Sequence, residues 1–484
     1  MNVRYFMRKR ERYKHLLNLF ANFVMLVAET AMFAFIWYKM YVPELEDKFW
    51  NRGNWAVIGM YALVLFFFIR TFGGYRIGYL RITDICLSQI LGILFANIIE
   101  YFQICMIAND YMSASPLLLL TTAEIAVTLP TVFVVRYFYV RLYPPRRMIV
   151  IYGEHSPEEL ISKINSRKDK YNVCATASAY MGYEALYSKI LEYEAVVLCD
   201  LPASIRNKIL KFCYDQNKRT YITPKISDII LNGTERIHLF DTPLMLSRNQ
   251  GLTIEQRFVK RTMDIVFALL AIVISSPFLL VIAVAIKLYD GGPVFYKQER
   301  LTRDRETFQI IKFRSMKVDS EKQGAQLAKK DDDRITPVGK IIRRTHLDEL
   351  PQIFNILKGE MSFVGPRPER QEIAEKYEEI VPEFRFRLKV KAGLTGYAQV
   401  YGKYNTTPYD KLKLDLTYIQ TYSAWLDVKL MLMTFKIMFQ KENTEGVDEK
   451  QTTDQKGIIE MEQTSEVQIS VIMPVYNARD YVEQ

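Results

Sequence analysis

The stretch MDIVFALLAIVISSPFLLVIAVAIKL, from Met263 to Leu288, decides how this chain meets a membrane. It is almost uncharged, and at ~1.5 Å rise per residue a straight helix of this length would cross a bilayer. Basic residues nevertheless flank both of its ends, with Lys260 and Arg261 before it, Lys287 in its last turn, and Lys297 and Arg300 after it. Because basic flanks favour the cytoplasmic side, both ends are expected on the same face of the membrane.

The middle of this stretch contains the feature that would turn the helix back. Pro277 removes one helix hydrogen bond, and the hydroxyl of a neighbouring serine such as Ser276 can satisfy the freed carbonyl. We therefore predict a re-entrant helix over 263–288, broken at Ser276-Pro277. The alternative is an ordinary kinked span, which would export everything that follows it.

Four further apolar stretches precede this helix, at about 15–40, 55–69, 84–108 and 116–135. Each approaches the ~20 residues that cross a bilayer. Basic residues crowd the first 14 positions and the loops after the second and fourth stretches, whereas the other two loops carry few. The positive-inside rule then predicts a four-helix transmembrane bundle over 1–146 in the inner (cytoplasmic) membrane, with a cytoplasmic N-terminus and everything after the fourth span cytoplasmic.

Three acidic residues fall inside these spans: Glu29, Glu100 and Glu124. Buried carboxylates in lipid are costly and often mark a transport function. Hydrogen bonding between helices, or a position near the membrane surface, is the alternative that we favour.

Residues 147–250 have a soluble pattern, with strand-like segments at Met148–Tyr152 and Ala195–Cys199 separated by helical ones. This alternation predicts a Rossmann-like α/β domain. A dinucleotide site would require several glycines after the first strand, but only Gly153 is present, so we interpret the domain as a spacer or regulatory unit.

The net charge of +10 indicates an anionic partner. Because the basic residues flank membrane segments, we expect membrane lipids and phosphate-bearing substrates, and no nucleic acid. The five cysteines form no CxxC pair, so neither a zinc site nor a disulfide framework is expected.

A dense series of motifs follows the re-entrant stretch. In chain order they are Gly292-Pro293-Val294-Phe295, Gln298-Glu299-Arg300, Lys312-Phe313-Arg314-Ser315-Met316, Arg343-Arg344-Thr345-His346-Leu347-Asp348-Glu349-Leu350-Pro351-Gln352, Phe363-Val364-Gly365-Pro366-Arg367-Pro368-Glu369 and Lys391-Ala392-Gly393-Leu394-Thr395-Gly396.

Together these motifs resemble the catalytic domain of the bacterial sugar transferases, the polyprenyl-phosphate hexose-1-phosphate transferases, over about 255–440. The four spans and the spacer resemble the large form of that family, in which the helix break at Ser276-Pro277 is a shared feature. Two departures are the turn Leu301-Thr302-Arg303-Asp304, where a glycine is common, and His346, where a small residue is usual. The meaning of His346 is left open.

Adjacent carboxylates such as Asp348 and Glu349 repel each other unless a cation or basic neighbours keep both ionised. A divalent metal would do this, and hard oxygen ligands favour Mg²⁺. The resemblance implies that Asp348 is the nucleophile, attacking the sugar-side phosphorus of a UDP-sugar and releasing UMP. It makes Glu349 the expected metal ligand, with Asp348 beside it.

Basic residues in the motifs supply groups suited to phosphate oxygens. The expected phosphate-binding set is Lys312, Arg314, Arg343 and the Pro366-Arg367-Pro368 segment, whose prolines fix the approach of Arg367.

The catalytic domain is predicted over 251–442. Residues 443–466 indicate a flexible linker, and 467–484 resemble the truncated start of a family 2 glycosyltransferase-like domain. That fragment is too short for a core or a site of its own.

The expected fold is thus a membrane α plus α/β architecture: a four-helix transmembrane bundle, a Rossmann-like spacer, and a mainly helical monotopic catalytic domain on the cytoplasmic face. The expected function is transfer of a sugar-1-phosphate from a UDP-sugar to undecaprenyl phosphate at the start of exopolysaccharide, capsule or O-antigen synthesis. The alternatives are a glycosyltransferase that releases UDP and a non-catalytic assembly scaffold. A homodimer is kept as an option, and the sugar is left open.

Overall fold

The computed structural model describes residues 2–45, 51–247, 251–317, 334–403 and 406–438. The contacts divide the chain into two units, one of Met1–Met245 with Trp425–Phe439 and the other containing Leu246–Ala424. Each unit is described by itself. The predicted linker 443–466 and the predicted glycosyltransferase-like start 467–484 lie outside the described residues.

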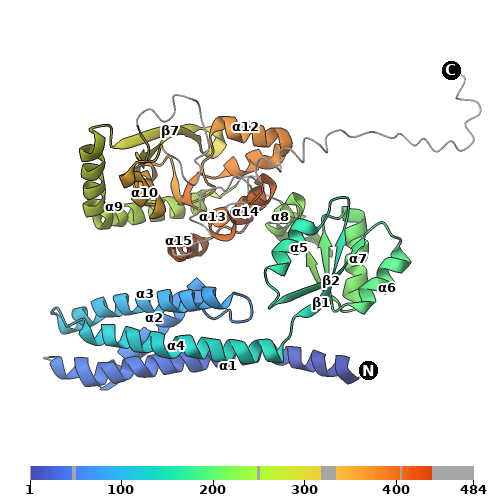
Figure 1. Ribbon diagram of the computed structural model, residues 1–484, viewed down its shortest axis with the longest axis horizontal. Coiled ribbons are helices and arrows are strands. Elements are labelled where there is room, and N and C mark those ends of the chain that lie inside the picture. Colours follow the sequence, from blue (N-terminus) through green and yellow to red (C-terminus); the bar gives the residue numbers. More distant parts are fainter. Residues whose placement is uncertain (1, 46–50, 248–250, 318–333, 404–405, 439–484) are drawn as a thin grey trace, which may run out of the picture. The chain divides into compact units, whose positions relative to one another are not determined.

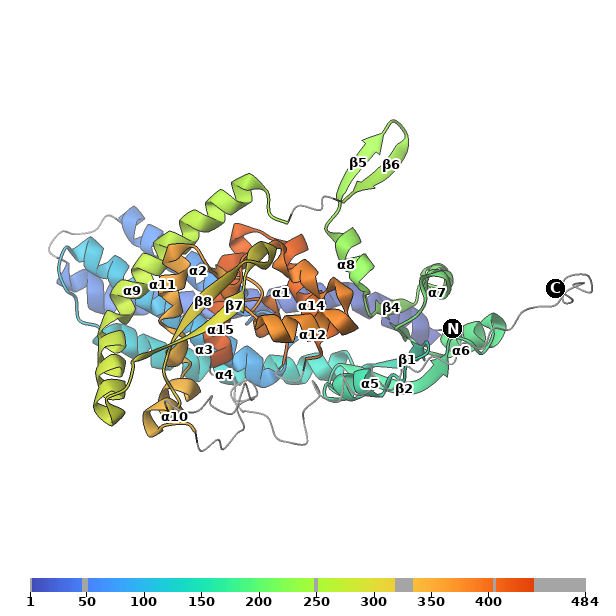
Figure 2. The same ribbon diagram turned by 90° about the horizontal axis from the view of Figure 1, so that it is seen from above.

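Four long helices form the first part of the N-terminal unit. Figures 1 and 2 show them lying side by side: α1 (Asn2–Ile36), α2 (Asn51–Phe72), α3 (Ile82–Ala108) and α4 (Ser115–Leu142). A π-helical turn η1 (Trp37–Tyr41) and a 3₁₀ turn η2 (Val42–Glu44) follow α1. The helices share a core that includes Phe33, Tyr61 and Phe72.

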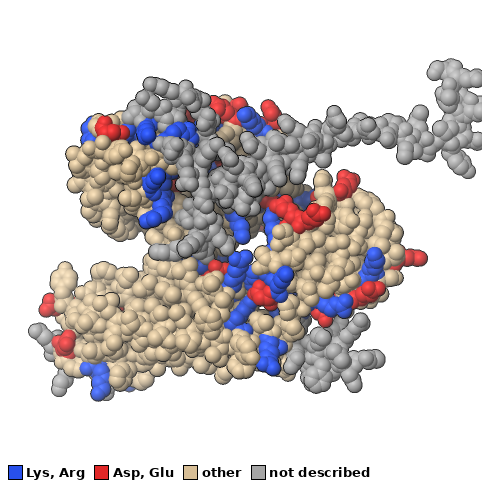
Figure 3. Space-filling view, in the orientation of Figure 1, with Lys and Arg blue, Asp and Glu red and all other residues tan. Residues whose placement is uncertain are grey.

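The outer surface of these helices is apolar as well. Large side chains such as Phe20, Leu63 and Phe102 are exposed, and charged side chains are sparse on this surface in Figure 3. Within the described residues, five helices are long and apolar enough to cross a membrane, namely the four above and α9 (Ile254–Asp290). Apolar surface of this extent indicates a membrane-associated protein.

Two of the carboxylates within these helices, Glu29 and Glu124, make contacts between helices. Tyr61 and Asn97 both donate to Glu124, with 2.9 Å between Asn97 Nδ2 and Glu124 Oε2, and Thr128 Oγ1 donates to Glu29 Oε1 at 2.9 Å. These bonds agree with the helix-to-helix hydrogen bonding that we favoured for Glu29 and Glu124. Glu100 is also buried, but neither of its carboxylate oxygens has a partner within the described residues.

The α/β region is built on a parallel sheet with strand order β2-β1-β3-β4. The strands are β1 (Arg146–Tyr152), β2 (Tyr171–Ser178), β3 (Ala195–Cys199) and β4 (Arg219–Ile222), with helices α5 (Glu158–Asn165), α6 (Tyr183–Glu192), α7 (Ala203–Asp215) and α8 (Ile226–Asn232), and a hairpin of β5 (Glu235–Leu239) and β6 (Thr242–Leu246). Alternate residues of β1 pack on opposite faces, Met148 and Val150 on one and Ile149 and Ile151 on the other. The α/β prediction for this region is therefore confirmed.

Gly153 has a packing role at the end of β1. A Cβ at this position would lie 2.6 Å from the carbonyl oxygen of Asp200, which follows β3. The backbone of the neighbouring strand therefore occupies the space, which explains an isolated glycine without a nucleotide.

Helix α9 opens the second unit. Its N-cap is Thr253, whose hydroxyl accepts from Gln256 N. Figure 1 shows α9 as two limbs that meet at a bend, and Pro277 lies inside the helix. Ser276 Oγ donates to Val273 O at 2.9 Å, the carbonyl that Pro277 cannot bond, as predicted. The re-entry of this helix into a membrane stays a prediction.

The rest of this unit consists of short elements. Strands β7 (Phe295–Leu301) and β8 (Thr307–Phe313) form an antiparallel pair, and β9 (Ser362–Val364) pairs in parallel with β10 (Gly393–Thr395). The remaining elements are η3 (Arg303–Arg305), α10 (Pro337–Arg344), η4 (Leu347–Glu349), α11 (Gln352–Lys358), α12 (Gln371–Ile380), η5 (Pro382–Lys389), α13 (Tyr397–Tyr401) and α14 (Pro408–Gln420).

The turn between β7 and β8 accounts for one departure from the family pattern. Asp304 and Arg305 both have left-handed backbone angles, with φ of 55° and 65°. Glycine adopts this region without strain, so a glycine-containing turn would suit the position, and the present chain accommodates L-residues instead.

Helix α15 (Ala424–Met438) belongs almost entirely to the N-terminal unit. Lys436 is buried, and its Nζ donates to Ser88 Oγ at 2.8 Å, while Phe435 packs on Phe95. This helix packs on α2 and α3. Its assignment to the predicted catalytic domain 251–442, like the other predicted domain boundaries, stays a prediction.

Candidate active site

The Asp348-Glu349 pair lies on the short 3₁₀ turn η4, directly after α10. Thr336 caps the start of α10 by accepting from Gly339 N at 2.9 Å, and Pro337 occupies the first turn. His346 then adopts a left-handed conformation, with φ of 56°. His346 lies between α10 and η4. Glycine adopts this region freely and histidine does so more often than most residues, so the backbone accounts for the residue choice at this departure.

Glu349 is the electrostatic centre of the site. Lys312 Nζ donates to its Oε1 at 2.7 Å, and Arg367 Nη2 donates to the same oxygen at 3.1 Å. Burial raises the pKa of Glu349, but the charges of Arg367 and Lys312 outweigh burial and lower the pKa to about 2. Glu349 is therefore ionised at neutral pH.

The pKa of Asp348 is shifted in the opposite direction. Burial and the neighbouring negative charge of Glu349 raise the pKa of Asp348, while the charges of Lys312, Arg343 and His346 oppose the rise. The two adjacent carboxylates thus differ in basicity, with Asp348 the more basic. Carboxylates whose pKa values are pushed apart commonly have different chemical roles.

The structure brings together most of the predicted site residues. Asp348, Glu349, Lys312 and Arg367 interact directly or electrostatically, and Arg343 acts on Asp348. Ser276 and Pro277 are not part of this group, because both lie at the bend of α9.

Arg314 is engaged elsewhere. Its side chain is buried and forms a two-pronged ion pair with Asp290 at the end of α9, with 2.7 Å between Arg314 Nη1 and Asp290 Oδ2. Gly292 packs against the same guanidinium group, since a Cβ there would lie 2.8 Å from Arg314 Nη1. This contact favours a structural role for Arg314, and its role in phosphate binding stays a prediction.

The Pro366-Arg367-Pro368 segment is held through its backbone. Pro366 O accepts from Gly393 N at 2.9 Å, and Pro368 O accepts from Arg300 Nη1 at 3.3 Å. A Cβ at Gly393 would lie 2.1 Å from Gly365 N, so the glycines of these two motifs allow the chains to touch. The guanidinium group of Arg367 is thus presented to Glu349 by a fixed loop.

A buried network of ion pairs supports the Pro366-Arg367-Pro368 segment. We did not predict this network. Arg387, which is 2% exposed, donates through Nη2 to Arg367 O at 3.0 Å and through Nε to Asp415 at 2.9 Å. Lys411 Nζ donates to Glu369 Oε1 at 2.7 Å. Burial raises the pKa of Glu369, but Lys411 and Arg387 outweigh it and lower the pKa to about 2. Glu369 belongs to a quoted motif, whereas Arg387 carries no local sequence signal.

Mg²⁺ binding by the carboxylates of the site stays a prediction. Within the described ranges, His, Cys, Asp and Glu form no group of three or more that could hold a metal alone. Asp348 and Glu349 provide two carboxylates, and Mg²⁺ is usually held by one or two carboxylates together with water and substrate phosphates. The donor set therefore fits a metal that arrives with a phosphorylated substrate.

We predict that Arg387→Met destabilises this unit by about 3 kcal/mol or more, because it leaves Asp415 as a buried, unpaired carboxylate. The check is the free energy of unfolding of the full chain in detergent, measured by denaturant titration. Arg385→Met is the matched control, since Arg385 is two residues away and exposed. Equal stability of the two variants would contradict the proposed support.

The comparisons with known proteins agree with this site. The sequence model of the family described as bacterial sugar transferase matches residues 255–441. A UDP-N-acetylgalactosamine-undecaprenyl-phosphate N-acetylgalactosaminephosphotransferase of Aeromonas hydrophila is 44% identical over 182 residues, which are 37% of this chain and 43% of the relative. A UDP-glucose:undecaprenyl-phosphate glucose-1-phosphate transferase of Escherichia coli is 41% identical over 209 residues, 42% of this chain and 43% of the relative.

A shorter relative is matched over most of its length. A UDP-glucose:undecaprenyl-phosphate glucose-1-phosphate transferase of Caulobacter vibrioides is 39% identical over 189 residues, which are 38% of this chain and 71% of the relative. The chain spans less than half the length of the Aeromonas and Escherichia proteins. The resemblance read from the motifs is confirmed, and this chain belongs to the bacterial sugar transferase family.

Proposed function

We propose that the chain transfers a sugar-1-phosphate from a UDP-sugar to undecaprenyl phosphate and releases UMP, as the first step of exopolysaccharide, capsule or O-antigen synthesis. The observation that carries this proposal is a difference between two adjacent carboxylates among cationic residues. The pKa of Asp348 is raised, whereas the pKa of Glu349 is lowered, so that Glu349 is ionised. The names of the relatives support the same reaction class.

The chemistry takes two displacements at one phosphorus. A carboxylate oxygen of Asp348 attacks the sugar-side phosphorus, the bond between the two phosphates breaks, and UMP leaves with the electron pair. An oxygen of undecaprenyl phosphate then attacks the same phosphorus and displaces Asp348. The sugar-phosphate group thus passes through a covalent bond to Asp348, which splits one difficult step into two.

The cationic neighbours would bind and orient the diphosphate. Lys312 and Arg367 are already held by Glu349, so their charges are in position before substrate arrives. Arg343 adds a third charge near Asp348. Charge-assisted contacts from such preorganised groups stabilise the negative charge that develops on the leaving phosphate.

Glu349, with Asp348 beside it, would hold Mg²⁺. A bound Mg²⁺ would supply charge neutralisation of the diphosphate.

The membrane arrangement follows from the substrates. We place the chain in the inner membrane as a multi-pass protein, with α1–α4 as spans, α9 as a re-entrant helix and the catalytic residues on the cytoplasmic face. The UDP-sugar then comes from the cytosol and undecaprenyl phosphate from the lipid. The relatives differ in the sugar that their names give, so the proposal covers UDP-hexoses and UDP-N-acetylhexosamines.

We predict that Asp348→Asn abolishes UMP release, with a loss of about 10⁴-fold or more, the scale seen when a nucleophile is removed. The assay uses purified full chain in detergent with Mg²⁺, undecaprenyl phosphate and UDP-glucose, UDP-galactose or UDP-N-acetylgalactosamine. The released nucleotide is identified by chromatography, and parallel reactions replace Mg²⁺ with EDTA.

Asp304→Asn is the matched control, because Asp304 is exposed and asparagine tolerates its left-handed backbone. This control should keep wild-type activity. Release of UDP instead of UMP would make the chain a glycosyltransferase, and full activity of Asp348→Asn would remove the nucleophile from the proposal.

The pH dependence of kcat/KM follows from the raised pKa of Asp348. The attacking carboxylate must be ionised, so activity is lost as the pH falls through this pKa. Because the charge of Arg343 lowers the pKa of Asp348, Arg343→Gln should raise it further and move the acid limb to higher pH. Lys340→Gln, an exposed position one turn earlier on α10, is the control. An acid limb that stays in place, or moves to lower pH, would contradict this assignment.

A further inference from the structure

Glu100, on helix α3, is a buried acid that the hydrogen bonds between the helices do not explain. Its side chain is 0% exposed, and neither of its carboxylate oxygens has a hydrogen-bond partner. In the part of the chain that the structure describes, no other carboxylate has two buried oxygens in this condition. An ionised carboxylate at this position would be buried without compensation, which is energetically costly.

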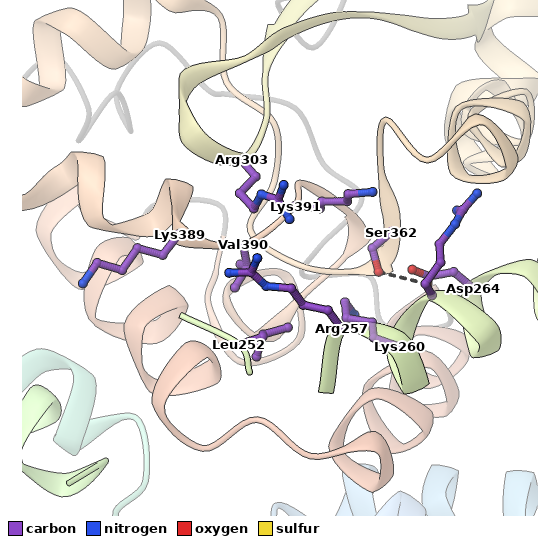
Figure 4. A pocket seen from close by; sticks show the side chains of 10 residues that line it. Leu252, Arg257, Lys260, Asp264, Arg303, Ser362, Lys389, Val390 and Lys391 are labelled. Atoms are coloured by element: carbon purple, nitrogen blue, oxygen red, sulfur yellow. Dashed lines mark hydrogen bonds between the residues drawn. The ribbon is translucent and has the colours of Figure 1, made fainter. Parts of the chain in front are cut away.

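Two buried acids of the second unit show the usual arrangement. Asp264 on α9 accepts through Oδ1 from Ser362 Oγ at 2.9 Å, the bond drawn in Figure 4, and from Phe363 N at 3.0 Å. Asp415 on α14 accepts from Arg387 Nε at 2.9 Å. Both acids therefore have donors that stabilise an ionised carboxylate, whereas Glu100 has none.

An amide on the same helix also lacks a partner. Asn97 precedes Glu100 by three residues, a spacing that places both on one face of α3. Asn97 is 5% exposed, and its Nδ2 donates to Glu124 Oε2 at 2.9 Å and to Thr121 Oγ1 at 2.8 Å. Its Oδ1 has no partner. Both Asn97 and Glu100 thus have buried oxygen atoms that lack a donor.

Three acids from three helices act on the hydroxyl group of Tyr61 on α2. They are Glu29 on α1, Glu100 on α3 and Glu124 on α4. Among the described residues, none of the three forms an ion pair with Lys, Arg or His. Carboxylates that share a buried region without a cation do not all stay ionised, so we expect at least one of them to hold a proton.

The hydrogen bonds indicate which acid holds the proton. Glu124 accepts from Tyr61 on one oxygen and from Asn97 on the other, and Glu29 accepts one hydrogen bond. Donors of this kind stabilise the ionised form of a carboxyl group. Glu100 accepts no hydrogen bond, so its ionised form is the least stabilised of the three.

We propose that Glu100 is a proton-binding site inside the helix bundle, where the acid holds its proton at neutral pH and donates a hydrogen bond to Asn97 Oδ1. This bond supplies the donor that Asn97 lacks, and protonation removes the uncompensated charge. Glu100, Asn97, Glu124 and Tyr61 then form a hydrogen-bonded chain across α3, α4 and α2. The site shares no residue with the proposed reaction, so either proposal can fail without the other.

The same proton makes Glu100 a site of chemical modification by a lipophilic carbodiimide. The acid proton moves to one nitrogen of the carbodiimide, and the carboxylate oxygen bonds to its central carbon. An acyl shift from oxygen to nitrogen then leaves a stable acylurea on Glu100. A neutral acid in apolar surroundings favours this reaction, because water and soluble nucleophiles are kept away from the intermediate.

The direct test is the infrared spectrum of the purified full chain in detergent at neutral pH, recorded for wild type and Glu100→Gln. Glutamine has nearly the shape of a protonated glutamic acid, so the variant should fold, and thermal unfolding checks this. We expect Glu100→Gln to lose the C=O band of a protonated carboxyl group. The matched control Glu44→Gln, at an exposed position, should lose a carboxylate band instead.

The hydrogen bond to Asn97 has its own variant. Asn97→Leu keeps a side chain of similar volume but removes the acceptor, so the band of the protonated carboxyl group should remain and change its position. A band that stays in place would overturn the assignment of Asn97 as the partner of Glu100.

Modification by dicyclohexylcarbodiimide tests the same proton through a second readout. After proteolysis, the mass of the peptide that contains Glu100 should show one acylurea in wild type and none in Glu100→Gln, while Glu44 stays unmodified. Two results would overturn the proposal: loss of a carboxylate band in Glu100→Gln, or an acylurea on Glu29 or Glu124 in place of Glu100.

Discussion

The candidate active site depends on the ion pairs that the carboxylate of Glu349 forms. Lys312 on strand β8 and Arg367 in the loop after β9 both donate to one oxygen atom of this carboxylate. Three segments far apart in sequence therefore meet around η4. Lys312 and Arg367 keep Glu349 ionised, and burial together with the charge of Glu349 makes Asp348 the more basic carboxylate. One ion-pair cluster thus both assembles the site and divides the roles of its two acids.

The cluster is only as rigid as the loop that carries Arg367. Arg387 and Arg300 hold carbonyl groups of this loop, while glycine contacts bring the Gly365 and Gly393 backbones together. A charged network so far from water is costly unless every member is paired. The position of the network explains why it is kept, because it fixes the loop that directs the guanidinium group of Arg367 toward Glu349.

Much of the fold and of the candidate site could be predicted from local sequence. Pro277 and its neighbouring serine predicted the broken helix and the bond that satisfies it, and the spacing of the strand-like segments predicted the α/β region. The grouping of Lys312, Asp348, Glu349 and Arg367 followed from motifs. The sequence alone could not separate Arg314 from these phosphate candidates, because its pairing with Asp290 is a tertiary contact. Arg387 and the docking of α15 on α2 and α3 are likewise products of packing that no local pattern reports.

The most direct test of the central claim is the mass of the peptide that contains Asp348 after incubation with a UDP-sugar in the absence of undecaprenyl phosphate. Our account predicts that this peptide gains one sugar-phosphate group on Asp348, and that adding undecaprenyl phosphate removes it. An unmodified peptide, together with UMP release only when both substrates are present, would contradict a covalent route and favour direct transfer between the substrates.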